Sequence, residues 1–319
     1  MKKIISLLLC ILILAGCSSK KTEFQGFSMD APYHISGYGL SEVQVQEIKD
    51  LLHHADSIYS AYLDSSKLSL LNHHKKLAVS NDDSDAKELY QIVSKALPYC
   101  DNYFDISIRG VSKLWNFASE TPAVPDAEDI ANNLASVNFQ NIILEDDFIY
   151  LENNAEIDLG AVAKGYVCDE IAASLEDKAL MIDIGGTIKT VGKDITAGVK
   201  APTVDGLLCS FTLPNGKAVA TSGSYERNFT VDGETYHHIL NPKTGYPFDN
   251  ELLSVSVICD SAMEADILAT KWFAMGKPQT VEGVDAIFVT KDHRVFVTYG
   301  IKNLKMLHND YTLMDEKVE

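Results

Sequence analysis

The sequence is short of cysteine and of basic residues, and beyond its first 16 residues it has no apolar run long enough to span a membrane. It holds six cysteines, none spaced as Cys-x-x-Cys, which argues against a metal cluster. A disulfide among the four cysteines that follow residue 17 stays open. Against 45 acidic residues there are only 27 lysines and arginines, so the net charge of −18 argues against a nucleic-acid partner.

The first residues, "MKKIISLLLCILILAGC", are typical of a secretory signal. Two lysines precede an apolar stretch, Ile4–Leu14, that is too short to cross a membrane as a mature helix. The ending Leu-Ala-Gly-Cys resembles a bacterial lipobox, in which cleavage leaves Cys17 as a lipid-modified N-terminus. The alternative is an ordinary signal peptide that happens to carry a cysteine.

Three segments follow from this interpretation. Residues 1–16 are the signal peptide, residues 17–23 a lipid-anchored polar tether, and residues 24–319 one folded domain, because no repeat or long linker divides them. We therefore expect a protein of the bacterial cell envelope, held by its lipid and facing the periplasm or the exterior.

Hydrophobic periodicity predicts more helix in the first half of the chain and more strand in the second. Residues 41–62 and 85–100 have the pattern of amphipathic helices, and residues 141–152 that of a hairpin. Strand-like runs are "ALMIDIG", "LCSFTLP", "AVATSG", "LLSVSVIC", "AIFVT" and "RVFVTYG". Helices and strands do not alternate regularly, so an α+β fold is favoured over a doubly wound sheet.

The segment Ser261–Pro278 predicts a helix with a capping box formed by Ser261 and Glu264. Within it, Asp266 and Thr270 are four residues apart and lie on one face, among apolar neighbours. Either Asp266 is a buried hydrogen-bond acceptor and Thr270 bonds to its own helix, or the pair belongs to a site.

Further polar residues occur beside glycines. Lys164 lies at the start of a predicted helix, where its charge is unfavourable unless an anion is present, although an exposed lysine is the alternative. Gly185 and Gly186 follow an apolar strand and form either a tight turn or a close approach to a ligand. His237 and His238 alternate along a strand, so at most one faces a site.

The order of these segments resembles the ApbE family of FAD:protein FMN transferases. The residues that carry the likeness are "DLGAVAKG", "IGG", "ATSG", "HILNPKTG" and "ADILAT", with "SMDAPYHISGYG", "SAYLDSSKLSLLN" and "FDISIRGVSKLWNF" upstream. The resemblance covers about residues 27 to 276. It implies a single mixed fold of two interleaved lobes, with antiparallel-rich sheets flanked by helices.

The resemblance also implies an activity, in which FMN passes from FAD to a threonine or serine of an acceptor protein and AMP is released. The acceptor is expected to be a membrane subunit of a redox-driven ion pump. Mg²⁺ is implied at Asp266, Thr270 and the carbonyl of Ala161, which offer the oxygen ligands this ion prefers. Asp266 is thereby a catalytic residue, and His238 is our candidate base for the incoming hydroxyl.

The expected contacts with FAD follow from the same likeness. They are Met29, Tyr62, Trp115, Asn116, Phe117, Asp158, Lys164, Gly185, Gly186, Ser222, Leu240 and Thr244. Lys164 would add positive charge near FAD, with Asp158 fixing the loop. The chain departs from the family pattern at Asp30, at Arg109, where glycine is common, and at Asn241. Two alternatives remain: an FAD pyrophosphatase giving FMN and AMP, and a non-catalytic lipoprotein that binds flavin.

Overall fold

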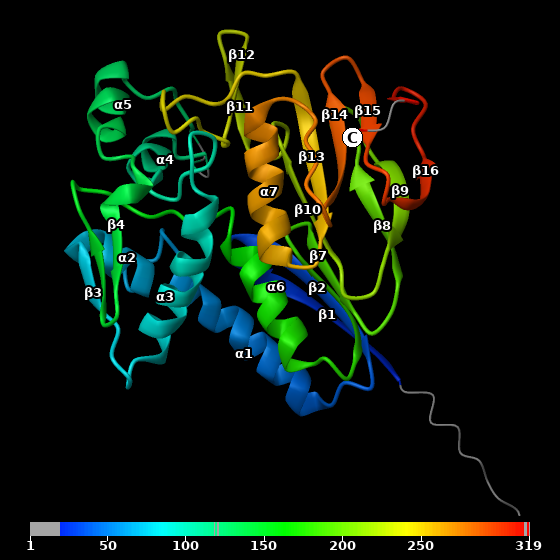
Figure 1. The fold of residues 1–319 in the computed structure, drawn as a ribbon, viewed down its shortest axis with the longest axis horizontal. Coiled ribbons are helices and arrows are strands. Elements are labelled where there is room, and N and C mark those ends of the chain that lie inside the picture. Colours follow the sequence, from blue (N-terminus) through cyan, green and yellow to red (C-terminus); the bar gives the residue numbers. More distant parts are fainter. Residues whose placement is uncertain (1–19, 118, 120, 316–317, 319) are drawn as a thin grey trace, which may run out of the picture.

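A computed structural model describes residues 20–117, 119, 121–315 and 318 (Figure 1). The helices within these residues are α1 (Glu42–Tyr59), α2 (Lys67–His74), α3 (Ser84–Ala96), α4 (Arg109–Trp115), α5 (Ala127–Leu134), α6 (Ala163–Ser174) and α7 (Ala262–Met275). The strands of the main sheet are β1 (Lys21–Ser28), β2 (Ala31–Tyr38), β6 (Ala179–Ile184), β7 (Thr187–Val191), β10 (Ala218–Gly223), β13 (Leu252–Cys259), β14 (Asp285–Thr290), β15 (Arg294–Val297) and β17 (Thr312–Leu313). Smaller sheets contain β3 (Lys76–Ala78), β4 (Ile142–Glu145), β5 (Phe148–Leu151), β8 (Ile195–Lys200), β9 (Leu207–Leu213), β11 (Asn228–Val231), β12 (Glu234–His237) and β16 (Lys302–Met306).

The main sheet has nine strands in the order β1-β2-β6-β7-β10-β13-β14-β15-β17. Every neighbouring pair is antiparallel except β15 and β17. The fold is therefore α+β, as the sequence predicts. The predicted tether is wrong at its end, because residues 21–23 already belong to β1, where Lys21 pairs with Tyr38. The chain is ordered earlier than expected because β2 offers these residues a full set of backbone partners.

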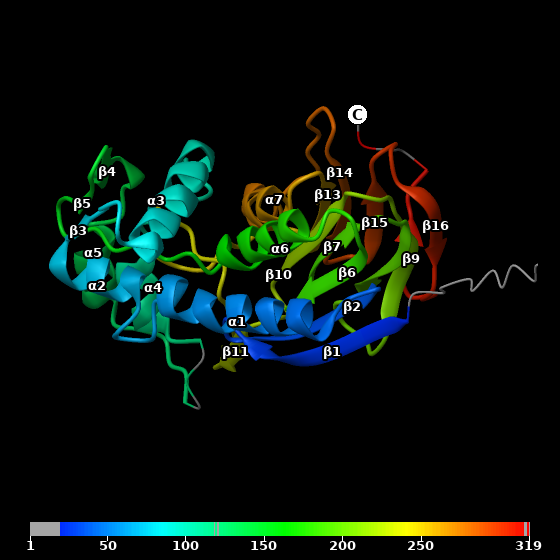
Figure 2. The same cartoon turned by 90° about the horizontal axis from the view of Figure 1, so that it is seen from below.

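Helices α6 and α7 lie against each other and against one face of this sheet (Figure 2). Helix α7 is buried nearly all round, since ten of its 14 residues are buried. Gly165 lies where the two helices touch, and a Cβ atom at this position would collide with the backbone of Ala262. The glycine of "AKG" thus allows α6 and α7 to approach closely.

On the opposite face of the sheet, the three-stranded sheet β16-β9-β8 covers β10, β13, β14 and β15. Their shared core contains apolar side chains of both sheets, among them Val199, Phe211, Val219 and Ile287. Alternating apolar residues on β8 and β9 produce this layer, because one face of each strand is buried.

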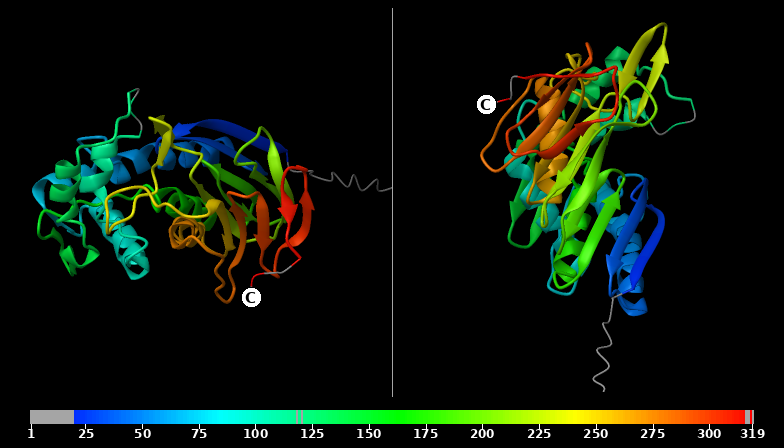
Figure 3. Two further views of the ribbon diagram at one scale, coloured as in Figure 1. Left: turned by 90° about the horizontal axis from the view of Figure 1, so that it is seen from above. Right: turned by 90° about the vertical axis from the view of Figure 1, so that its right-hand side faces the viewer.

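A helical lobe containing α2 to α5 and the small sheet β3-β5-β4 lies beside the main sheet (Figures 1 and 3). The chain enters this lobe through α1 and returns to the sheet at α6. The segment after β12 contacts the helical lobe again, because the carbonyl of Gly245 accepts a hydrogen bond from Trp115 Nε1 at 2.8 Å. The two lobes are therefore interleaved in sequence, which positions a cleft between them.

The predicted helices at 41–62 and 85–100 are confirmed as α1 and α3, and the predicted hairpin as β4 and β5. Four cysteines, Cys100, Cys168, Cys209 and Cys259, are buried and free, with no disulfide among the described residues. No helix in the described part of the chain is both long and apolar enough to span a membrane. Cys17 and the signal peptide lie outside the described residues.

Candidate active site

A cleft of about 780 Å³ lies between the two lobes. Its walls come from the β1–β2 turn, the end of α1, the segment before α6, the β6–β7 turn, the end of β10, the loop after β12 and one face of α7. This volume is in the range of pockets that enclose a small molecule or cofactor. Because so many separate segments converge here, the cleft is the candidate active site.

Asp266 of α7 is buried, with 5% of its surface exposed, yet it reaches the cleft. Its Oδ1 accepts a hydrogen bond from Thr187 Oγ1 at 3.0 Å, and its Oδ2 accepts one from the backbone N–H of Gly165 at 3.1 Å. Helix α6 has no side-chain cap of its own, so this carboxylate satisfies one of its free N–H groups and complements its positive end.

The positive charge of Lys164 at the start of α6 is stabilised by an ion pair with Asp266. Lys164 Nζ lies 3.2 Å from Asp266 Oδ2 and donates to the carbonyl of Gly160 at 3.0 Å. The ammonium group therefore has a fixed anionic partner at the edge of the cleft. The lysine also remains partly exposed, so it can approach a second anion.

Thr270 lies one turn after Asp266 and also lines the cleft. Its Oγ1 donates to the carbonyl of Asp266 at 3.2 Å and lies 2.9 Å from Ser222 Oγ at the end of β10. The back-bond to its own helix, one of the two alternatives from the sequence, is thus present. It leaves the hydroxyl oxygen on the cleft wall, where its lone pairs can contact a ligand.

His238 lines the cleft at the end of the β11–β12 hairpin, and solvent reaches its ring from the cleft. Surrounding protein atoms, then the charge of Arg227 and the neighbouring His237, lower the pKa of His238 below the usual imidazole range. His238 is therefore neutral at pH 7 and able to accept a proton.

His237 points the other way, as alternation predicts. It is buried, its Nε2 donates to the carbonyl of Phe248 at 2.9 Å, and its Nδ1 accepts from the N–H of Ile239 at 3.3 Å. Burial also lowers the pKa of His237. Both ring nitrogens are used within the protein, so this histidine has a structural role.

Two loops complete the polar wall. Asp158 accepts hydrogen bonds from the N–H of Gly160 at 2.9 Å and from Ser112 Oγ at 2.8 Å, which fixes the segment before α6. Gly185 and Gly186 form the β6–β7 turn with φ values of +58° and +86°, a conformation that favours glycine. The tight turn, one of the two alternatives from the sequence, is confirmed, and this turn lines the cleft.

Most of the residues expected from the sequence lie on the cleft. The structure brings together Met29, Tyr62, Phe117, Asp158, Ala161, Lys164, Gly185, Gly186, Ser222, His238, Leu240, Asp266 and Thr270.

Three expected flavin contacts do not line this cleft. Trp115 is fully buried, and it packs in an aromatic cluster with Phe117 and Phe229. Asn116 ends α4 with a left-handed backbone (φ 39°). Thr244 lies in the turn after β12, where its Oγ1 accepts from the N–H of Tyr246 at 3.3 Å. In each case local structure uses the side chain or backbone, and contact of these three residues with flavin stays a prediction.

The sequence interpretation missed Arg227 as a cleft residue and noted Arg109 only as a departure from the family pattern. Arg227 lies on the cleft wall and pairs with Asp30 of the β1–β2 turn at 2.9 Å. Arg109 stacks on the ring of Tyr62, with its guanidinium carbon 4.4 Å from the ring centre. Arginines are scarce in this acidic chain, and that scarcity was the available signal.

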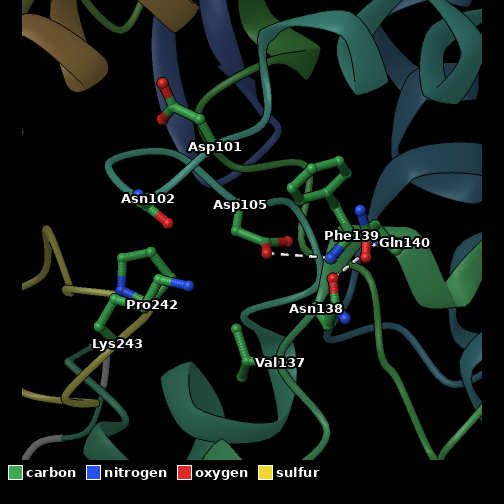
Figure 4. A pocket seen from close by; sticks show the side chains of 9 residues that line it. All are labelled: Asp101, Asn102, Asp105, Val137, Asn138, Phe139, Gln140, Pro242 and Lys243. Atoms are coloured by element: carbon green, nitrogen blue, oxygen red, sulfur yellow. Dashed lines mark hydrogen bonds between the residues drawn. The ribbon is translucent and has the colours of Figure 1, made fainter.

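A smaller hollow of about 450 Å³ adjoins the cleft. Asp105 and Pro242 line both the hollow and the cleft. Figure 4 shows Asp105 within hydrogen-bonding distance of the N–H of Phe139, at 3.0 Å. Burial raises the pKa of Asp105, although its hydrogen bonds with Ser107 oppose this. The Asp105 carboxylate thus links the segments of Ser107 and Phe139 through hydrogen bonds.

Residues 29–288 match the model of the ApbE family. The chain belongs to the ApbE family. It is 33% identical over 290 residues to an FAD:protein FMN transferase of Klebsiella pneumoniae, covering 86% of this chain and 91% of that relative. It is 30% identical over 291 residues to an FAD:protein FMN transferase of Treponema pallidum, covering 81% of this chain and 80% of that one.

The fold is similar to that of solved family members. The crystal structure of an ApbE protein from Thermotoga maritima superimposes with a TM-score of 0.76 at 28% identity. The match covers 85% of this chain and 95% of that one. The family likeness therefore extends to both lobes and to the cleft between them.

Proposed function

We propose that this ApbE-family chain is an FAD:protein FMN transferase. Beyond the similarity to relatives of that name, one observation carries the proposal. A single cleft combines a buried carboxylate and a hydroxyl on α7, the ammonium of Lys164 and the neutral imidazole of His238. A pyrophosphate substrate needs positive charge and hard oxygen ligands for a cation, and an incoming hydroxyl needs a base.

The oxygen atoms at α7 suit Mg²⁺. Over the described part of the chain, no three His, Cys, Asp or Glu side chains gather as a metal site. A cation here would therefore combine one carboxylate, that of Asp266, with the hydroxyl of Thr270 and the carbonyl of Ala161. Magnesium accepts few protein ligands when water and phosphate oxygens complete its shell. When bound, it would neutralise charge on the pyrophosphate.

The residues of the chain perform the remaining steps. Lys164 faces the anionic pyrophosphate, and the Gly185–Gly186 turn lets the backbone approach it. The acceptor hydroxyl attacks the phosphorus of the FMN half, and its proton passes to an imidazole nitrogen of His238. The bond from that phosphorus to the bridging oxygen breaks, and AMP leaves with that oxygen. The product is a phosphoester between FMN and the acceptor threonine or serine.

We propose the class of acceptor from the family resemblance, and the cellular location from the signal peptide. We propose that Cys17 carries a lipid that holds the domain at the surface of a bacterial membrane, facing the periplasm or the exterior. A membrane subunit of a redox-driven ion pump is an acceptor within reach of such an anchor. The support is the Leu-Ala-Gly-Cys ending of the signal peptide.

Purified protein incubated with FAD and Mg²⁺ distinguishes the proposal from its two alternatives. A transferase releases AMP only when an acceptor protein is added, and the acceptor gains the mass of FMN. Rapid release of AMP without an acceptor indicates a pyrophosphatase. Bound FAD that stays intact in both cases indicates a binding protein. Co-expression with a candidate membrane subunit, followed by mass spectrometry of that subunit, is the corresponding test in cells.

A further inference from the structure

Tyr62 presents an aromatic ring to the cleft from the segment between α1 and α2. Its side chain is exposed, with 58% of the residue surface open, and it lines the cleft. The backbone of this segment is fixed, because Ser60 Oγ accepts from the N–H groups of Tyr62 and Leu63 at 3.2 and 3.1 Å. The ring itself extends beyond these bonds, and an exposed ring has several rotamers available.

Arg109, the first residue of α4, lies against this ring. Its guanidinium carbon is 4.4 Å from the centre of the Tyr62 ring, a cation–π contact. The same group donates from Nη2 to the carbonyl of Ala61 at 2.8 Å, so it binds the neighbouring residue as well. Arg109 thus holds both the backbone and the ring of this segment.

Nη1 of the Arg109 guanidinium is buried and has no hydrogen-bond partner among the described residues. A buried donor without an acceptor is unfavourable for folding, and buried polar groups are rarely left in this state. The arrangement lacks one hydrogen bond and keeps the guanidinium over the ring of Tyr62. Contact with the ring, and not hydrogen bonding alone, therefore determines the position of this group.

We infer that Arg109 is a positioning residue, which holds the Tyr62 ring as a flat wall of the cleft for an aromatic ring of FAD. The inference rests on the proposed function, since it needs a substrate with a flat aromatic part. One face of the Tyr62 ring is covered by the guanidinium. The other face is then presented in a single orientation, which lowers the entropy that binding must remove.

A double-mutant cycle tests this role. FAD affinity is measured by quenching of flavin fluorescence, together with KM and kcat for transfer, on Arg109→Met, Tyr62→Ala, Tyr62→Phe and the combined variants. Arg109→Met is expected to weaken FAD binding and raise KM for FAD roughly 3- to 30-fold, with kcat changed little. This loss persists with Tyr62→Phe, which keeps the ring, and vanishes with Tyr62→Ala. Lys113→Met is the matched control, because Lys113 is a cation of the same helix that pairs with Glu156 at 2.8 Å.

Four results would overturn the inference. The first is an equal loss from Arg109→Met with and without the Tyr62 ring, which indicates a purely structural role. The second is unchanged FAD affinity in Tyr62→Ala, which decides the matter even if Arg109→Met fails to fold. The third is a wild-type protein that does not bind FAD, which rejects the proposed function together with the inference. Normal binding by the wild type with no effect of Arg109→Met rejects the inference alone.

Discussion

Two adjacent histidines illustrate how burial separates roles at the scale of single residues. His238 faces the cleft, whereas both ring nitrogens of His237 bond within the protein. We expect His238→Ala to lower kcat for transfer strongly while leaving FAD affinity and melting temperature nearly unchanged. His237→Ala should instead lower the free energy of unfolding by about 1–3 kcal/mol, because it leaves the Phe248 carbonyl and the Ile239 N–H without their partner. Equal losses of kcat at matched stability would reject the assignment of His238 as the base.

The pH dependence of transfer provides a second test of His238. A base works when it is unprotonated, and the pKa of His238 is lowered in the folded protein. The rate should therefore stay level as pH falls through 6.5, where an unperturbed imidazole becomes protonated, and decline only at more acidic pH. The measurement is kcat against pH at saturating FAD. A rate that halves near pH 6.5 would show that the pKa of His238 is not lowered in the folded protein.

For single residues, the sequence predicts which polar side chains belong to the site better than it predicts which aromatic ones do. Asp266 and Thr270 could be selected because a carboxylate and a hydroxyl on a buried helical face need a reason. Trp115 gave no such signal, since an aromatic residue serves equally well in a core or on a ligand. Its indole N–H reaches Gly245, 130 residues away, and only the folded chain shows that contact.

At the scale of elements, the contact between α6 and α7 holds Lys164 and Asp266 together. Gly165→Ala should lower the free energy of unfolding by about 1–3 kcal/mol and reduce transfer, because the added methyl group collides with Ala262 and separates the helices. Gly110→Ala is the matched control in α4, where the atoms nearest to the added Cβ are Ser136 Oγ at 3.3 Å and Asn133 Oδ1 at 3.5 Å, so no collision results. Thermal melting and transfer assays on both variants are the measurement. Similar melting temperatures and transfer rates of the two variants would show that close packing of α6 on α7 is not required for stability or transfer.

Element boundaries were partly predictable. Ser261 caps α7 as expected, accepting from the N–H of Glu264 at 3.2 Å. The reciprocal half of the capping box is absent, because Glu264 instead accepts from Tyr99 of the other lobe at 3.1 Å. Asp169 of α6 binds the N–H groups of Ala262 and Met263. The local sequence pattern predicts where a helix starts. Residues distant in sequence then supply hydrogen-bond partners for its first N–H groups.

For the whole molecule, the class of fold could be predicted and its strand order could not. Irregular alternation of helices and strands favoured α+β, and the antiparallel sheet confirms it. The pairing of β2 with β6 joins residues about 150 positions apart, and no local pattern encodes it. The cleft depends on this pairing, because the β1–β2 turn and the β6–β7 turn form two of its walls.

The membrane anchor is also a property of the whole molecule. We expect Cys17→Ser to release the protein from the membrane fraction and to leave transfer by the released protein intact, because the domain that carries the cleft begins at Lys21. Membrane fractionation and sequencing of the mature N-terminus are the measurements. A Cys17→Ser protein that still sediments with membranes would contradict the lipid anchor.

The most direct test of the account concerns Asp266. Asp266→Asn removes the charge while its amide can still accept from the N–H of Gly165 and donate to Thr187 Oγ1. FMN transfer should be titrated with Mg²⁺ on this variant, with melting temperature measured on the same sample. We expect a folded protein whose transfer is lost at every Mg²⁺ concentration. A folded Asp266→Asn protein that remains active and responds to Mg²⁺ would contradict it.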